Sequence, residues 1–256
     1  MKNIFIFILT LFFGFSQAQK LDNIQSGEQL TYRIHYGVLT AGSATLSANK
    51  KNYEKEPHLH VKGVGRSTGA VRAFFKVEDI YESYINLRTG LPSYYIRNVS
   101  EGGYRQHLHA DFNHGNNSLI LTDKKNSKNP PRTIKTVSGI QDMLSAFYFL
   151  RDKGTTMKVG DVHSMNIWID DEMFPFRLRV AGSEDVKTAF GTVNCLKIIP
   201  SVMSGRVFKD KEGVTLYVTN DANLVPISIK AELAVGSLKA SLSDYKNVKY
   251  PINFRK

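Results

Sequence analysis

The chain has 256 residues, 42% of them hydrophobic and 22% charged, with a formal net charge of +11 at pH 7. Its single cysteine, Cys195, excludes an intrachain disulfide, so the hydrophobic core must supply the stability. Lysine and arginine are dispersed and form no long block of like charges, which argues against a nucleic-acid partner. The basic surface fits either simple solvation or an anionic partner such as a lipid phosphate or an acidic glycan.

The N-terminal segment has the layout of a secretory signal peptide. Lys2 gives a positive start, residues 4–15 are apolar, and Ala18 ends the small-residue pattern of a cleavage site. We therefore expect residues 1–18 to be removed and residues 19–256 to be exported to the periplasm or, as the alternative, secreted. A retained N-terminal anchor is the other interpretation. No second apolar run is long enough to cross a membrane, so we expect a soluble monomer.

Residues 24–123 show the alternation typical of β-strands. In GEQLTYRIHYGVLTAGSATL, strand patterns flank Gly37 and Gly42, so these glycines do not open a helix that could bind phosphate. They are expected to let a long strand bulge or turn back. In YRQHLHADF, from Tyr104 to Phe112, apolar side chains share one face, which predicts an antiparallel sheet with one buried face.

One segment, SGIQDMLSAFYFLRDKG, has the periodicity of a helix. Its apolar residues recur at helical spacing, at Ile140, Met143, Leu144, Phe147 and Leu150. Ser138 is the expected N-cap, and Asp142 falls in the first turn. These features predict a largely buried helix over about residues 138–152.

Residues 157–250 return to strand-like alternation. Asp170, Asp171 and Glu172 separate MNIWI from FPFRLRV and predict a hairpin turn. Cys195 lies among apolar strand residues and is expected to be a small buried hydrophobe rather than a nucleophile. We therefore expect residues 19–256 to form a single β-rich domain. Its two sheet halves, 24–123 and 157–250, would be joined by a loop and the buried helix.

A metal site is one interpretation of the motif HLHAD. It places His107, His109 and Asp111 at alternate positions on one strand face, and two imidazoles with a carboxylate suit zinc. Arg105 lies on the same face, however, and its charge opposes a cation. A solvent-facing polar strand is therefore preferred, and neither a metal nor another cofactor is expected.

No catalytic residue is predicted. The chain lacks H-E-x-x-H, a Walker loop and a dinucleotide fingerprint. Glu78 with Asp79, and the acids at 170–172, could supply an acid and a base for glycoside cleavage, but adjacent acids on a strand or turn point to different sides. We therefore expect a protein that is not an enzyme, with a metal-dependent or glycan-acting hydrolase as the alternative.

The segment GRSTGAVRAFFKVEDIYESY mixes cations with aromatic rings. Such a mixture can line a cleft for an amphiphile or a glycan, and two consecutive phenylalanines on a strand cannot both face the core. The candidate ligand-binding residues are Arg66, Arg72, Phe74, Phe75, Tyr81 and Tyr84. Packing of these side chains in the core is the alternative.

Three stretches in this order resemble the exported bacterial family called domain of unknown function 3108. They are GEQLTYRIHYGVLTAGSATL, FFKVEDIYESYINLRTGLP and RNVSEGGYRQ, and the similarity extends over about residues 24–250. Its specific parts are Gly27-Glu28 with Tyr32, Gly37 with Ala41-Gly42, Tyr81 to Tyr84 with Leu91-Pro92, and Glu101-Gly102-Gly103. The part after the helix matches the family more loosely.

The resemblance implies a location and a shape rather than an activity. The family looks like periplasmic envelope proteins, with a long antiparallel sheet curled as an open barrel or β-spiral around one central α-helix. This shape is similar to lipoprotein-carrier half-barrels and envelope-integrity spirals. We therefore expect a mainly β, non-enzymatic module that binds a lipid-like amphiphile or a cell-wall glycan, with a scaffold for envelope proteins as a further alternative. The resemblance assigns no catalytic residue.

Overall fold

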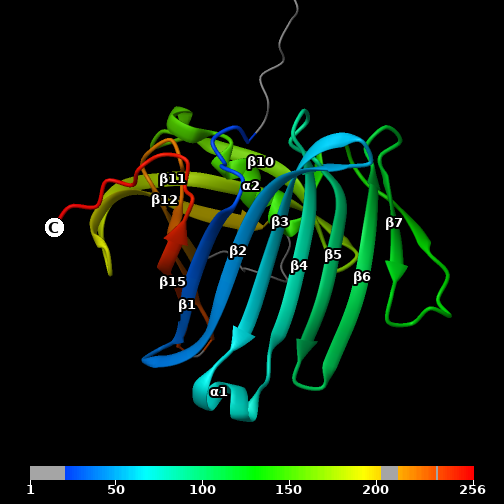
Figure 1. Ribbon diagram of the computed structural model, residues 1–256, viewed down its shortest axis with the longest axis horizontal. Coiled ribbons are helices and arrows are strands. Elements are labelled where there is room, and N and C mark those ends of the chain that lie inside the picture. The colour runs from blue at the N-terminus through cyan, green and yellow to red at the C-terminus, as the bar shows by residue number, and fades with distance from the viewer. Residues whose placement is uncertain (1–20, 203–212, 235) are drawn as a thin grey trace, which may run out of the picture.

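The structure is a computed structural model that describes residues 21–202, 213–234 and 236–256 (Figure 1). The expected signal peptide, residues 1–18, lies outside the described residues. Within them, no helix combines the length and the hydropathy that crossing a membrane requires.

The described residues form one sheet of fifteen strands and three short helices. The first strands are β1 (Glu28–Tyr36), β2 (Leu39–Tyr53), β3 (Glu56–Ser67), β4 (Glu78–Asn86), β5 (Pro92–Glu101), β6 (Tyr104–Asn113), β7 (Ser118–Asp123) and β8 (Arg132–Lys135). The others are β9 (Ile140–Gln141), β10 (Val162–Ile169), β11 (Glu172–Thr188), β12 (Gly191–Val202), β13 (Val214–Thr219), β14 (Pro226–Glu232) and β15 (Ser237–Lys246). The helices are α1 (Gly69–Phe74), α2 (Met143–Arg151) and the 3-10 turn η1 (Gly154–Thr156).

The strand order runs from β8 back to β1 and then from β15 back to β9. β1 and β15 pair antiparallel, so the first and last strands join the two halves of the sheet. The short β9 runs parallel to β10, and the other ladders are antiparallel. The prediction of a mainly β, antiparallel fold is confirmed. The sheet is open, because in the described part of the chain β8 and β9 form its two unpaired edges.

The two end regions of the open sheet, β5 to β8 and β9 with β10, meet through side chains. Residues 136–139 connect β8 to β9, a stretch that spans less than about 20 Å. Trp168 of β10 packs edge-on against Tyr95 and Phe112, with ring centroids 6.3 and 6.2 Å away. In addition, Asp170 in the β10–β11 turn forms an ion pair with Arg97 of β5. Packing and charge therefore bring together end regions that no ladder joins.

The β1–β2 hairpin explains both glycines of the first strand pattern. Gly37 and Val38 form a two-residue turn, and Gly37 has φ +55°, which glycine adopts without strain. The register between the strands shifts just after this turn, as in a β-bulge. A Cβ atom on Gly42 would lie 2.5 Å from the backbone oxygen of Arg66, so the close approach of β3 requires glycine.

Helix α2 begins at Met143, later than predicted. Ser138 is not its N-cap, because Oδ1 of Asp142 accepts hydrogen bonds from the N–H groups of Leu144 and Ser145 at 2.8 Å each. The two residues of β9 precede this cap and pair with β10 instead. An aspartate that binds the free N–H groups of the first turn fixes where the helix starts.

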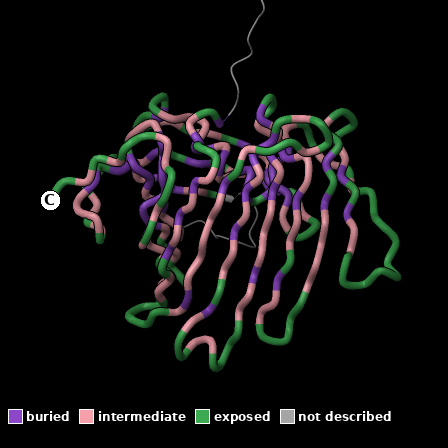
Figure 2. Tube along the Cα trace, viewed as in Figure 1, coloured by how far each residue is buried: buried purple, intermediate pink, exposed green. Residues whose placement is uncertain are grey.

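The two sides of α2 pack against different halves of the sheet. Leu144 and Tyr148 belong to a buried cluster with residues of β3 and β4. Ala146 and Leu150 belong to a second cluster with residues of β10 to β13. In Figure 1 the strands β10 to β12 cross behind the broad face formed by β1 to β7, and in Figure 2 the buried residues gather in the upper part of the view.

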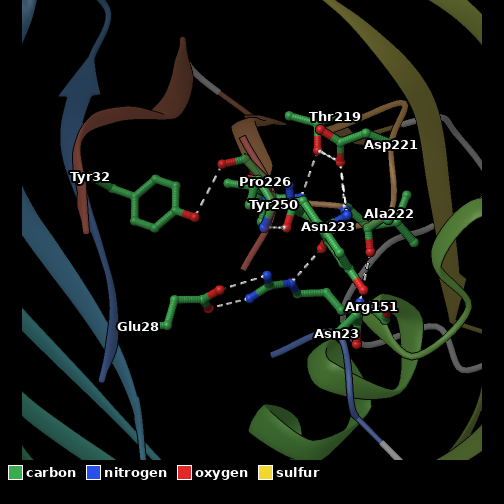
Figure 3. Close-up of polar contacts among 12 residues, drawn as sticks. Asn23, Glu28, Tyr32, Arg151, Thr219, Asp221, Ala222, Asn223, Pro226 and Tyr250 are labelled. Carbon is green, nitrogen blue, oxygen red and sulfur yellow. Dashed lines mark hydrogen bonds and ion pairs between the residues drawn. The ribbon is translucent and has the colours of Figure 1, made fainter. Parts of the chain in front are cut away.

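A buried ion pair anchors the C-terminal end of α2 (Figure 3). Arg151 donates from Nη1 and Nη2 to the carboxylate of Glu28 in β1, at 2.5 and 2.9 Å. Its Nε donates to the backbone oxygen of Asn223 at 3.0 Å, before β14. Nδ2 of Asn23 donates to the backbone oxygen of Arg151 at 2.5 Å. The network joins the helix to both halves of the chain.

Candidate functional site

An apolar cavity lies between α2 and the strands β10 to β14. Its volume is about 270 Å³, on the order of ten methylene-sized groups if each takes roughly the space of a water molecule. The lining residues are all apolar and include Ala146 and Leu150 of α2, Leu178 of β11 and Leu216 of β13. A cavity of this chemistry suits the hydrocarbon part of a ligand.

A second, more polar pocket adjoins the apolar cavity. It has a volume of about 160 Å³ and shares Met143 and Ile169 with the cavity. Arg97, Asp170 and the hydroxyl-bearing Tyr81 also line this polar pocket. Burial raises the pKa of Tyr81, so its hydroxyl stays protonated at neutral pH. The two spaces together present a hydrocarbon interior beside a cation, a carboxylate and a hydrogen-bond donor.

Trp168 places a further donor in the wall of the polar pocket. The side chain is buried, and its Nε1 has no hydrogen-bond partner among the described residues. Buried polar groups are normally hydrogen-bonded. Among the described residues, the indole N–H of Trp168 is therefore an unpaired buried donor next to the polar pocket.

Asp142 is a buried titratable side chain next to the wall of the apolar cavity. The residue is fully buried directly before Met143, and Ser83 Oγ donates to its Oδ2 at 2.6 Å. Burial raises the pKa of Asp142 to about 6, although its hydrogen bonds act in the opposite direction. The carboxyl that caps α2 therefore titrates at mildly acidic pH.

A comparison with protein families identifies the family to which the chain belongs. The model of a protein family of unknown function, DUF3108, matches residues 31–243. The chain belongs to the DUF3108 family. The resemblance inferred from its first strands and from Glu101-Gly102-Gly103 is thereby confirmed. No curated protein matches the sequence.

Two solved structures are similar to this DUF3108 protein. A crystal structure from Brucella abortus, described as a β-barrel-like protein of domain of unknown function DUF1849, has a TM-score of 0.53 at 9% identity. The match covers 86% of this chain and 97% of that chain. A DUF1089 family protein from Pseudomonas aeruginosa has a TM-score of 0.36 at 10% identity, with 71% and 87% covered. At such identity the first likeness shows a shared β-barrel-like fold.

The structure separates the two tyrosines that the sequence placed in one ligand site. Tyr81 of β4 lines the polar pocket. Tyr84 lies three residues further along, so it points to the opposite face of β4. There its ring centroid lies 4.5 Å from that of His60 in β3. Of the six predicted residues, Tyr81 is the one that reaches the cavity region.

The other four predicted residues lie at the end of β3 and on or next to α1. Arg66 is exposed, and Arg72 forms an ion pair with Glu78 at 2.8 Å. The short α1 interrupts the strand pattern, so Phe74 is 92% exposed. Phe75 is 52% exposed, and its ring lies against Gly102 in the β5–β6 turn. The role of this segment of the DUF3108 protein in ligand binding stays a prediction. The segment lies far from α2 in the fold.

The histidines of HLHAD lie on the face of β6 opposite its buried side chains. The Nε2 atoms of His107 and His109 are 2.9 Å apart, and Tyr94 Oη lies 2.5 Å from His109 Nδ1. Burial lowers the pKa of His109, which favours the neutral ring. With Asp111 they made up the alternative metal site. In the described ranges, no group of three or more His, Cys, Asp or Glu is arranged to hold a metal ion.

Sequence reasoning missed one motif and two pocket residues. Residues 65–69 read GRSTG, the spacing of the nucleophile elbow of hydrolases. The Ser67 side chain is buried, and its Oγ accepts a hydrogen bond from the N–H of Val77 at 2.9 Å, so it closes the loop around α1. Arg97 and Trp168 gave no signal beyond strand alternation, because the fold alone brings their distant strands together.

Proposed function

We propose that this protein is a non-enzymatic binding protein of the cell envelope that holds the hydrocarbon part of an amphiphile. The observation that carries the proposal is the apolar cavity of about 270 Å³, which is lined by apolar residues and shares Met143 and Ile169 with the polar pocket. A glycan needs hydrogen-bonding groups that the cavity lining lacks, so the amphiphile is favoured over the cell-wall glycan.

The size of the cavity predicts weak, reversible binding. Each buried methylene contributes about 0.8 kcal/mol, so roughly ten of them supply on the order of 8 kcal/mol. Association costs about 4 kcal/mol or more in lost translational and rotational freedom. The hydrocarbon contacts alone therefore leave only a modest affinity. Such a balance suits a protein that takes up an amphiphile and releases it again.

The polar head of the amphiphile would occupy the polar pocket. Arg97 and Tyr81 offer donors there, and Trp168 Nε1 is a buried donor with no partner among the described residues. Because Arg97 is already paired with Asp170, a head group with oxygen acceptors competes with that carboxylate. This competition favours a head group that carries oxygen atoms and negative charge.

The proposal includes export and the absence of catalysis. The signal-peptide layout of residues 1–18 supports a periplasmic protein. The buried, hydrogen-bonded Ser67 and the lack of a carboxylate pair across the cavity lining support binding rather than hydrolysis. Fractionation of cells that express the full chain tests the location. N-terminal sequencing should give Gln19 as the first residue of periplasmic protein, and intact Met1 in the cytoplasm would contradict it.

Trp168 provides the direct test of ligand binding. It is the single tryptophan of the chain, and it lies in the wall of the polar pocket. A brominated fatty acid bound in the cavity should quench its fluorescence in a saturable manner. The Ala146→Phe variant should fill the cavity and weaken this quenching by at least tenfold.

Ala189→Phe is the matched control, because Ala189 is exposed at the β11–β12 turn and the same side chain is added there. This variant should bind like the native protein. Urea unfolding of both variants checks that they are folded. Absence of saturable quenching, or equal quenching of the Ala146→Phe variant, would refute the proposed function.

A further inference from the structure

Several connections of the sheet lie together at one end of the strands. Tyr36 pairs with Leu39 across the first hairpin and with Leu238 at the start of β15. Gly42, close to that hairpin, pairs with Ser67 at the end of β3, which places α1 at the same end. A further bridge joins the residue before β4 to the end of β5. Figure 1 accordingly shows these connections along the lower edge of the view.

We call this end the lower rim, defined by residues 36–39, residues 66–76 and residues 101–105. Large hydrophobic side chains protrude from it. Val38 is 97% exposed, Leu39 57%, and the two phenylalanines of the α1 connection are exposed as given above. Val38 is the second residue of a tight turn, and α1 buries none of its residues, so neither segment can reach the core. Exposed apolar side chains that gather in this way mark an interaction surface.

Four cations lie beside the apolar side chains of the lower rim. Arg66 and Arg105 are exposed at the end of β3 and the start of β6. Arg72 and Lys76 share Glu78, at 2.8 and 3.0 Å. Glu101 lies on the rim, and Glu78 and the buried Asp79 adjoin it at the start of β4, so four cations face three acids. The rim is therefore positively charged as well as apolar.

We propose that the lower rim docks the protein on an anionic lipid bilayer. Val38, Leu39 and Phe74 would enter the headgroup region, while Arg66 and Arg105 contact lipid phosphates. Apolar tips beside cations are complementary to a surface that is anionic outside and hydrocarbon beneath. A protein partner would have to offer the same two layers in one groove, so the charge pattern favours the membrane. This inference does not require the apolar cavity.

Vesicle sedimentation with the protein purified after export tests the docking surface. Vesicles of phosphatidylcholine are compared with vesicles of an equal mixture of phosphatidylcholine and phosphatidylglycerol. The protein should bind the anionic vesicles more tightly, and added salt should weaken that binding. The double variant Val38→Asp with Phe74→Asp should lose at least tenfold in affinity, since two apolar side chains no longer enter the bilayer.

Val159→Asp is the matched control, because this valine is 55% exposed outside the lower rim, between η1 and β10. It should bind vesicles like the native protein. The double variant Arg66→Gln with Arg105→Gln should lose about fivefold per charge at low salt. All replaced side chains are exposed, so urea unfolding should show native stability.

Three results would overturn the docking proposal. They are equal binding to neutral and anionic vesicles, unchanged binding of the Val38→Asp and Phe74→Asp variant, and a change of oligomeric state in that variant without vesicle binding by the native protein. The last result would make the rim a protein interface. The Ala146→Phe variant should still bind vesicles, so failure of docking and failure of cavity binding are distinguishable.

Discussion

The two sides of α2 are packed differently. Towards β3, a Cβ atom on Gly63 would lie 3.2 Å from Leu46 Cδ2 and 3.7 Å from Leu144 Cδ2, so that side is filled. Towards β10 to β14, Ala146 and Leu150 instead border the cavity of about 270 Å³. This space is partly open at the surface, so the second side of the helix is covered less completely than the first. The first half of the sheet therefore packs tightly against the helix, while the second half leaves an open apolar space beside it.

Polar anchors reinforce this division. Asp142 at the start of α2 accepts from Ser83 of β4, and Arg151 at its end pairs with Glu28 of β1. Both anchoring strands belong to the first half of the sheet. The anchor at Arg151 also reaches the second half of the chain, because its Nε donates to the backbone oxygen of Asn223. The side-chain partners of both anchors, Ser83 and Glu28, nevertheless lie in the first half of the sheet.

The largest expected effect comes from breaking the buried ion pair. Arg151→Met should lower the free energy of unfolding by about 3–5 kcal/mol, because it leaves the Glu28 carboxylate buried without its partner. Urea unfolding followed by circular dichroism measures the loss. Replacing both residues, as Glu28→Leu with Arg151→Met, should recover most of it. A single variant within about 1 kcal/mol of the native protein would show that the pair does not anchor the helix.

The next effect concerns the other anchor and its dependence on pH. The pKa of folded Asp142 is about 6, above the unfolded value of about 4. The folded protein therefore binds this proton more tightly, and the stabilisation that it gives is complete below about pH 4 and lost as the pH rises to about 6. The shift corresponds to on the order of 3 kcal/mol.

Asp142→Asn isolates this contribution, because asparagine still caps the helix but does not titrate. Urea unfolding of both proteins between about pH 4 and pH 7 should show the native protein losing free energy of unfolding relative to the variant as the pH rises. Parallel curves would mean that the Asp142 carboxyl has an ordinary pKa in the folded protein.

Local features of this fold can be predicted from the sequence, but the candidate site beside α2 cannot. The alternation from Tyr104 to Phe112 predicts β6 and its buried face, and Gly37 predicts the first hairpin. The start of α2 was misplaced at Ser138, because the pairing of β9 with β10 competes with helix formation there. Glu28 and Arg151 are 123 positions apart. Neither that pair nor the volume left beside α2 is encoded in any local pattern.

A pair of small-to-large substitutions compares the two sides of α2 directly. Gly63→Ala should lower the free energy of unfolding by about 1 kcal/mol, because Leu46 must shift by a few tenths of an ångström to admit the new methyl group. Ala146→Leu adds three carbon atoms beside the cavity and should change stability by less. Thermal or urea unfolding gives both values. A larger loss for Ala146→Leu would reverse the assignment of the filled and the open side.

The smallest effect on stability, together with a specific effect on binding, is expected from a substitution in the polar pocket. Arg97 of β5 and Asp170 of the β10–β11 turn pair between the two end regions of the sheet, and Asp170 is exposed. Since such pairs contribute less than about 1 kcal/mol, Arg97→Gln should leave the free energy of unfolding nearly native.

Arg97→Gln should nevertheless weaken quenching of Trp168 by a brominated fatty acid, while quenching by a brominated alkane without a head group is unaffected. Arg132→Gln removes a comparable pair with Asp171, outside the polar pocket, and should change neither ligand. If Arg97→Gln weakens quenching by the acid and by the alkane equally, Arg97 acts by holding the two end regions of the sheet together and does not bind the head group.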